Sequence, residues 1–369
     1  MSNYLKFFGT SILIFLFVGT NNLQAQRFVN EFLNIGVGAR AHGMFGSVVA
    51  NVDDGTSAYW NTAGLTQIES NLEINAMHAN WFGGIANYDY LSIAKKIGGE
   101  KRAAGALTII RMGVDNIPNT LNLIGPDGSV NFDRVTVFSA SDFAAFLSYA
   151  RGINDKLSIG GNIKVINRNI GSFGTAWGFG ADLGLQYRGE KFSFGAMARD
   201  ITTTFNAWSF NLTEEEKITF QRTGNEIPVS STEITLPRLI VGVATHGGSE
   251  KFSYLLEANL ALSTDGTEAA VFGGRGFNAD PTIGLEFGLF QKVFIRGGIG
   301  NIQSVINPTI DANNSREFEF QPNIGMGLKL GKLQVDYALT NIGSVSGVLV
   351  SHIFSVKLDF VVKNKDTEK

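Results

Sequence analysis

The chain has no cysteine, little proline and few charged residues. Among its 369 residues there are 0 Cys and 7 Pro, and Asp, Glu, Lys and Arg together make up 17%, against roughly 25% in soluble domains. The absence of cysteine excludes disulfides, thiolate metal sites, cysteine nucleophiles and a lipid anchor on an N-terminal cysteine. The net charge of −3 gives no basic footprint, so no nucleic-acid partner is expected.

Histidine is also scarce, and no arrangement of residues resembles a catalytic centre. The four histidines, His42, His78, His246 and His352, are scattered without the spacing of metal ligands. The stretch "GVGARAHG" lacks the strand–loop–helix context of a nucleotide-binding loop. We therefore expect no metal, no cofactor, no catalytic residues and no enzyme activity. The alternative is an outer-membrane hydrolase that uses paired acidic and basic residues.

The N-terminus has the pattern of an export signal. Lys6 precedes the apolar run "FFGTSILIFLFVG", and small residues ending at Ala25 provide a cleavage site. The run is too short for a spanning helix, which needs roughly 20 residues. Residues 1–25 are therefore predicted to be a cleaved signal peptide. Since no later run is long enough either, membrane insertion would require a β-barrel.

From residue 71 onward, apolar and polar residues alternate with the period of a β-strand. In "LSIGGNIKVINR", for example, Ile159, Ile163 and Val165 share one face, whereas Asn162 and Lys164 share the other. Strands in globular proteins favour about 5–6 residues, and membrane-crossing strands about 9–11. Most of these segments have the longer length. The fourteen segments are 71–78, 88–97, 102–113, 142–151, 157–168, 176–189, 192–200, 236–246, 252–263, 282–291, 293–301, 322–330, 333–342 and 351–362.

The connections between these segments alternate between short and long. Those after even-numbered segments are tight, such as "GGEK", "GEK" and "GK", whereas those after odd-numbered segments include 114–141 and 201–235. This alternation is typical of an outer-membrane barrel with a periplasmic rim of turns and an outer rim of loops. The sequence thus predicts an all-β, fourteen-stranded antiparallel transmembrane barrel in the cell outer membrane. Both mature termini would be periplasmic, with 363–369 as a periplasmic tail.

The face opposite the apolar one carries charges of both signs, which suits a filled lumen better than an ion-selective pore. A fourteen-stranded barrel also lies between the sizes that side chains fill and those that hold a channel. We therefore predict that 26–70 forms a plug inside a barrel of residues 71–362, with inward carboxylates available to Arg40. The inward charged residues are Lys164, Arg168, Asp182, Arg188, Arg199, Glu257, Glu286, Arg296, Lys329, Asp336, Lys357 and Asp359.

The predicted plug contains two blocks, "FLNIGVGARAHGMFG" and "DDGTSAYWNTAGL", the second of which indicates a short helix capped by Asp54 or Thr56. These blocks resemble the N-terminal signature of PorV/PorQ-type outer-membrane proteins of Bacteroidetes. That family is similar in fold to the FadL-like fatty-acid transporters, which have fourteen strands around an N-terminal hatch. The residues of the plug motif are Gly36, Gly38, Ala39, Arg40, Gly43, Met44, Tyr59, Trp60, Asn61, Ala63 and Gly64.

The resemblance implies a part in the type IX secretion system, binding translocon components or the C-terminal signal domains of secreted proteins. The alternative is a FadL-like channel for uptake of hydrophobic small molecules, with an apolar pocket beneath the outer loops. In either case the partners include outer-membrane lipid. Aromatic residues on outer loops commonly anchor partners, although they can also form a lid or an interfacial belt. The candidate partner-binding residues are Trp208, Phe210, Phe220, Leu121 and Phe132.

Overall fold

A computed structural model describes residues 29–98, 102–125, 127–264, 272–274, 277–306, 316–342 and 350–360. The predicted signal peptide, 1–25, and the predicted tail, 363–369, lie outside these ranges. So do parts of several predicted loops.

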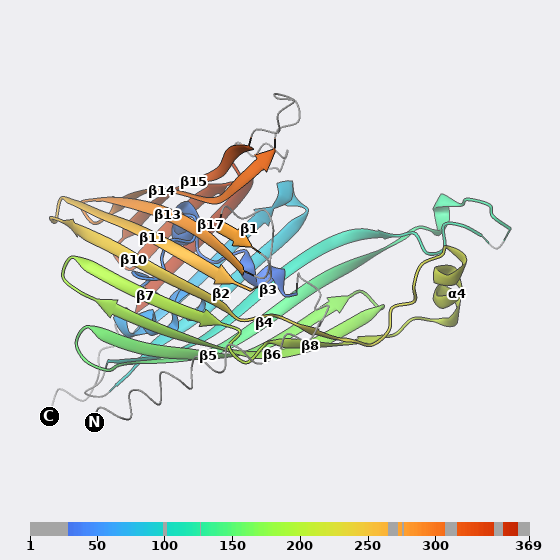
Figure 1. Cartoon of the computed structure of the whole chain (residues 1–369), viewed down its shortest axis with the longest axis horizontal. Coiled ribbons are helices and arrows are strands. Elements are labelled where there is room, and N and C mark those ends of the chain that lie inside the picture. The colour runs from blue at the N-terminus through green and yellow to red at the C-terminus, as the bar shows by residue number, and fades with distance from the viewer. Residues whose placement is uncertain are drawn as a thin grey trace.

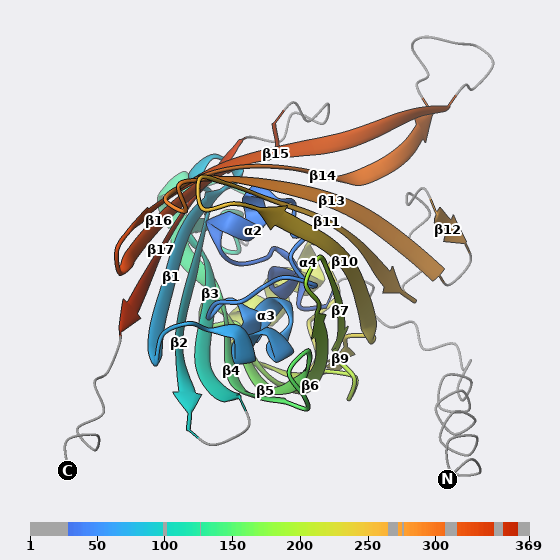
Figure 2. The ribbon, with the colours of Figure 1, turned by 90° about the vertical axis from the view of Figure 1, so that its left-hand side faces the viewer.

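Fourteen long antiparallel strands form one closed sheet, in which β1 pairs with both β2 and β17 (Figure 2). Each of the fourteen segments expected from the alternation overlaps one of these strands, so the predicted fold class is confirmed. The strands are β1 (Leu72–Trp81), β2 (Ala86–Ile97), β3 (Ala103–Asn119), β4 (Thr136–Gly152), β5 (Leu157–Ile170), β6 (Gly174–Arg188), β7 (Phe192–Arg199), β10 (Arg238–Gly248), β11 (Phe252–Ser263), β13 (Phe277–Leu289), β14 (Val293–Ile306), β15 (Arg316–Leu330), β16 (Leu333–Thr340) and β17 (Ser351–Phe360).

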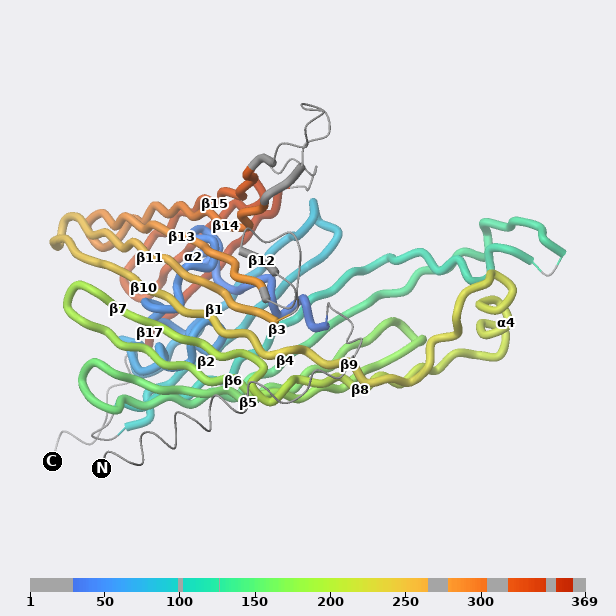
Figure 3. Tube along the Cα trace, in the orientation of Figure 1, coloured from blue at the N-terminus to red at the C-terminus, as the bar shows by residue number. Residues whose placement is uncertain are grey.

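Several strands extend further than the alternation predicted, mostly toward the long connections. β3 continues to Asn119, and β4 begins at Thr136. These two strands project far beyond the rest of the barrel (Figures 1 and 3). Both faces of the projecting part contain exposed residues. Alternation is lost where neither face packs on apolar material, which is why the sequence did not reveal these extensions.

Three short strands and one helix occur within the connections: β8 (Phe205–Phe210), β9 (Thr232–Ile234), β12 (Phe272–Gly274) and α4 (Glu214–Arg222). β8 pairs with the outer half of β6, whereas β7 pairs with the inner half. The chain between β7 and β8 bulges, because residues 199–204 face only 180–182 of β6. Asp200 and Thr203 have φ values of 56° and 59° there. The segment 201–235, predicted to be a loop, is therefore partly a continuation of the wall.

The two faces of the wall differ as the alternation predicted. Outward apolar side chains are exposed, with Ile163 at 61% and Met326 at 61%, whereas inward Glu257 is 0% and Arg296 3% exposed. An outer band of apolar side chains is the surface that a bilayer requires of a barrel. Within the described ranges, no helix is both long and apolar enough to cross a membrane.

The chain from 29 to 70, hereafter the luminal segment, lies inside the barrel (Figure 2). It contains η1 (Glu31–Asn34), α2 (Ala39–Gly43), α3 (Ser57–Trp60) and η2 (Thr62–Gln67). α3 follows Thr56, whose backbone N–H donates to Asp54 Oδ1 at 2.9 Å. It ends at Trp60, and the side chain of the next residue, Asn61, accepts a hydrogen bond from Ala63 N–H and so caps η2. The short helix therefore lies where the sequence placed it. Two further 3₁₀ helices lie in the connections: η3 (Phe82–Gly84) joins β1 to β2, and η4 (Phe132–Arg134) precedes β4.

Candidate ligand-binding vestibule

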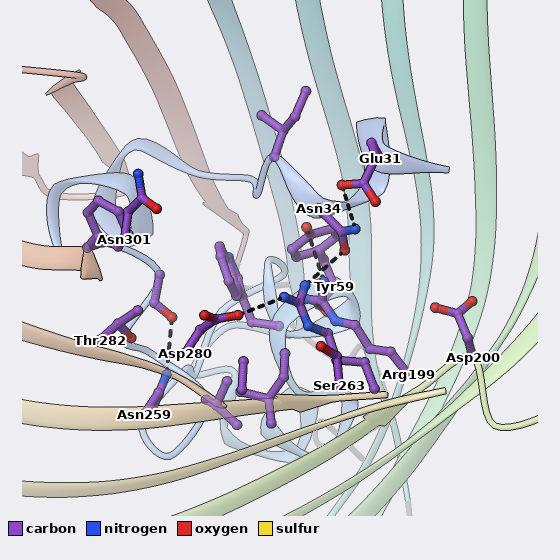
Figure 4. A pocket seen from close by; sticks show the side chains of 18 of the residues that line it. Glu31, Asn34, Tyr59, Arg199, Asp200, Asn259, Ser263, Asp280, Thr282 and Asn301 are labelled. Atoms are coloured by element: carbon purple, nitrogen blue, oxygen red, sulfur yellow. Dashed lines mark hydrogen bonds and ion pairs between the residues drawn. The ribbon is translucent and has the colours of Figure 1, made fainter. Parts of the chain in front are cut away.

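A cavity of about 720 Å³ lies inside the barrel, near the strand ends that carry the long connections. We call this cavity the vestibule. Its floor is the luminal segment, which contributes His42, Phe45, Tyr59 and Trp60. Its wall comes from the inward residues of β7, β10, β11, β13, β14, β15 and β16, together with Trp81 of β1. Figure 4 shows several of these side chains around the cavity.

The floor is held by close contact between the two signature blocks. The Trp60 indole donates from Nε1 to Val37 O at 2.8 Å. A Cβ would come within 3.1 Å of the same indole at Gly36 and within 3.0 Å of it at Gly46. Both glycines also have positive φ, at 98° and 73°, which favours glycine over other residues. The spacing of the blocks thus has a structural reason, because the first block wraps around the Trp60 ring of the second.

Below the vestibule, charges of the luminal segment pair with charges of the wall. Arg40 contacts Glu286 at 3.0 Å and Asp53 at 3.0 Å. Arg296 contacts Glu286 at 2.5 Å and Asp336 at 2.6 Å. We call these five residues the ionic clasp. Desolvation alone would raise the pKa of Asp53, but the nearby guanidinium of Arg40 and that of a second arginine hold this pKa below its usual value. The inward carboxylates expected for Arg40 are present.

Arg199 joins the wall to the floor at the point where β7 ends. Its guanidinium lies 4.3 Å from the centre of the Tyr59 ring and donates to Tyr59 O at 3.1 Å. The next residue, Asp200, contacts Lys164 at 2.6 Å, and Lys164 also contacts Asp182 at 2.8 Å. Lys164 and Asp182 are both almost completely buried. The bulge between β7 and β8 is therefore anchored by ion pairs on one side and by the luminal segment on the other.

His42 lies on the boundary between the vestibule and the packed region below it. The side chain is 5% exposed, and its ring lies 5.6 Å from that of Trp81 in an edge-to-face arrangement. Burial lowers the pKa of His42 to about 4, despite a hydrogen bond with the backbone of Gly36. The imidazole is therefore neutral near pH 7.

The structure brings the whole plug motif together in the lumen. Asn61, for example, donates to Val49 O at 2.8 Å and to Leu185 O at 3.0 Å, joining the segment to β6. Of the motif, Tyr59 and Trp60 line the vestibule, whereas Arg40 and Gly43 face the packed region. Met44 is completely buried.

The candidate partner-binding residues are not gathered in one place. Phe132 is 76% exposed, near the end of the projecting hairpin. Trp208, in contrast, is only 7% exposed and lies in β8 beneath the Arg168 guanidinium, 5.3 Å from its ring centre. The expectation that Trp208 is presented on an outer loop therefore needs correction, because that stretch is a wall strand. Leu121, Phe210 and Phe220 are half-buried.

Sequence reasoning missed the polar residues of the vestibule wall. Asn301 and Gln321 lie in the parts of β14 and β15 that alternate poorly, and only strand register brings them to the cavity. Asn259 lies on the polar, inward face of the segment 252–263, and this was the only feature of the sequence that placed one of these residues in the lumen. Among the described residues, no group of three or more acidic or histidine side chains could hold a metal ion.

No model of a known protein family and no curated protein matches this sequence. Solved structures do match. The CymD monoaromatic hydrocarbon channel is 15% identical over 89% of this chain and 99% of that chain, with a TM-score of 0.54. The toluene transporter TodX of Pseudomonas putida is 13% identical over 88% and 98%, also at 0.54. A FadL homologue of Pseudomonas aeruginosa is 11% identical over 88% and 98%, at 0.50. At these identities the likeness establishes a FadL-like barrel fold.

Proposed function

We propose that this chain is a non-enzymatic outer-membrane barrel that admits small molecules with an apolar part through the vestibule. The observation that carries the proposal is the cavity itself, about 720 Å³ in volume, with an aromatic floor. Ligand pockets typically have volumes of roughly 300–1,000 Å³ and a few polar groups among apolar ones. The long-loop rim would face outside, as the alternation of connections suggests.

The fold neighbours support this reading, because those named are a hydrocarbon channel and a toluene transporter. A shared fold does not by itself establish a shared function, so the proposal depends first on the cavity and second on these neighbours. The lining includes the apolar residues Phe45, Trp60, Leu236 and Ile240 beside polar and charged ones, whereas the channel alternative expected an apolar pocket. In this proposal the luminal segment closes the route below the vestibule, so passage would require that segment or the wall to move.

Uptake into liposomes tests the proposal. The full chain is reconstituted, and uptake of radiolabelled toluene is compared with that of liposomes holding a Phe45→Asp variant. We expect saturable uptake that the variant reduces, because a carboxylate at the aromatic floor disfavours an apolar ligand. The control is Thr245→Ser, a conservative change on the outward face of β10, away from the vestibule. Uptake no greater than into empty liposomes would contradict the proposal.

A second candidate is a role in type IX secretion as a PorV/PorQ-type protein. It rests on the signature blocks and on the projecting β3–β4 hairpin, where Phe132 and Val137 are 76% and 64% exposed. Exposed aromatic side chains of this kind commonly anchor protein partners. Purification from solubilised membranes tests it. Recovery of translocon components or secreted proteins, lost on Phe132→Ser substitution, is the expected result, and recovery of neither would exclude this role.

A further inference from the structure

The short turns lie at one end of the barrel, opposite the connection that holds α4 (Figure 1). Each of six short turns ends in a lysine or an arginine directly before the next strand begins. The backbone carbonyl of each of these residues accepts an N–H from the adjacent chain segment, at 2.7–3.1 Å. They therefore occupy equivalent positions at the edge of the sheet, and we call them the rim cations. The rim cations are Arg102, Lys156, Lys191, Lys251, Lys292 and Lys332.

The lysines among the rim cations lie on the luminal phase of the strands. The residue after each lysine belongs to the outward apolar face, and Phe192, Phe252 and Val293 are 55%, 45% and 41% exposed. Successive side chains of a strand point to opposite faces, so the preceding lysine is on the inward phase. The lysines themselves are exposed to solvent. They therefore surround the mouth of the barrel below the luminal segment, rather than continuing the lipid-facing band.

The positive charge of this rim is not neutralised within the described part of the chain. There, none of the rim cations forms an ion pair with a carboxylate. Asp155, Glu190 and Glu250 directly precede three of the lysines and are the acidic residues of the described turns. Six cations against three acids leave an excess of three positive charges, which is available to a partner.

The long connections at the other end have the opposite sign. The described parts of 120–135 and 201–235 hold seven acidic residues and three basic ones. A negatively charged partner is therefore attracted to the rim of short turns and repelled from the opposite rim. The acidic residues are Asp127, Asp133, Glu214, Glu215, Glu216, Glu226 and Glu233, and the basic residues are Arg134, Lys217 and Arg222.

The spacing of the rim cations favours an extended partner over a small anion. They precede alternate strands of the sheet, and adjacent strands lie about 4.8 Å apart, so neighbouring rim cations are about 10 Å apart. A single phosphate or carboxylate pairs over about 4 Å and can contact one of them at a time. One exposed ion pair is weak, whereas a chain with several carboxylates can contact several lysines at once.

We propose that the rim cations form a docking surface for an acidic, extended polypeptide segment of another protein, which lies across the mouth of the barrel. Lysine suits this role because its ammonium group is a mobile point charge that requires no fixed partner geometry. The luminal phase of the lysines disfavours an anionic lipid surface as the partner. In the orientation proposed above, the partner is periplasmic. This surface is separate from the vestibule and does not depend on the function proposed for it.

Fluorescence anisotropy of a labelled decaglutamate peptide tests the proposal. The peptide is titrated with the full chain in nanodiscs of phosphatidylcholine, which leave both ends of the barrel accessible. The rim variant replaces three rim cations by glutamine, and the control variant makes three equivalent changes in the long connections, so the two variants lose the same charge. The rim substitutions are Lys191→Gln, Lys251→Gln and Lys332→Gln, and the control substitutions are Arg134→Gln, Lys217→Gln and Arg222→Gln.

The full chain is expected to bind the peptide, and the rim variant to bind it about tenfold more weakly, as the loss of three exposed ion pairs predicts. The control variant should bind as tightly as the full chain. Added salt should weaken binding by screening, and free glutamate at the same carboxylate concentration should not compete.

Three results would overturn the proposal. The first is no binding by the full chain, or equal weakening in both variants. The second is effective competition by free glutamate, which would indicate a small-anion site. The third is loss of the difference between the full chain and the rim variant in nanodiscs that contain phosphatidylglycerol, which would indicate that lipid phosphates occupy the lysines.

Discussion

The two halves of the lumen are built in opposite ways. The half below His42 is packed by glycine contacts and by the ionic clasp of Arg40, Asp53, Glu286, Arg296 and Asp336. The half above it holds the vestibule, where several buried polar atoms have no partner among the described residues. The same luminal segment packs against the wall in the lower half and forms the floor of the vestibule in the upper half. The difference indicates that the segment is anchored to the wall below and lines an open cavity above.

Removing a charge from the clasp should have the largest effect. Arg296 is 3% exposed and contacts Glu286 and Asp336. Arg296→Met would remove the positive charge that pairs with these two buried carboxylates, which typically costs about 3–5 kcal/mol of the free energy of unfolding. Urea unfolding in lipid vesicles, followed by tryptophan fluorescence, measures the loss. Arg151→Met on the exposed face is the control. A loss no greater than that of the control would mean that the lower half does not depend on the clasp.

Acidification should weaken the boundary between the halves. Burial lowers the pKa of His42 from 6.5 to about 4, so the unfolded chain takes up a proton before the folded chain does. The contribution of neutral His42 is fully present above pH 6.5 and is lost as the pH falls to about 4. The total loss is about 3 kcal/mol.

The difference between the urea midpoints of the full chain and a His42→Phe variant isolates this dependence. The variant retains the pH dependence that the other titratable groups give to stability, but it lacks the imidazole of His42. The two stability curves should diverge as the pH falls between 6.5 and about 4. Parallel curves over that range would show that His42 is accessible to water in the folded protein.

Close packing below the vestibule predicts a strong contrast between two adjacent glycines. A Cβ at Gly298 would come within 2.3 Å of Met44 C in the luminal segment, whereas a Cβ at Gly297 would meet no atom within 4 Å. Gly298→Ala should cost about 1–3 kcal/mol through overpacking. Gly297→Ala should change stability by less. Equal urea midpoints for the two variants would contradict the placement of Met44 against β14.

The smallest effect is expected in the vestibule. Ala261 lines the cavity, so Ala261→Leu should change the free energy of unfolding by about 0.5 kcal/mol or less. Ala338→Leu is the counterpart in the packed region, at 0% exposure, and should cost about 1–3 kcal/mol. Urea unfolding of both variants makes the comparison. A larger loss for Ala261→Leu than for Ala338→Leu would reverse the assignment of open and packed regions.

The wall was predictable from the sequence because lipid on one face and polar atoms on the other impose a period of two. Leu157 to Val165 and Phe252 to Leu262 show that period along their whole length. The prediction stopped at the outer strand ends, as at Asn301, because both faces there are polar. Arg40 and Glu286 could both be assigned to the lumen, but their pairing could not, since strand register alone brings them together. A pocket beneath the outer loops was expected under the channel alternative, but its lining residues could not be named for the same reason.

Ion conductance in planar bilayers is the most direct test of the central claim that the luminal segment closes the barrel below an open vestibule. The purified full chain is compared with a general porin under the same voltage. The account predicts no steady conductance for this chain, because the clasp and the glycine contacts hold the luminal segment against the wall. A stable conductance similar to that of the porin would contradict it.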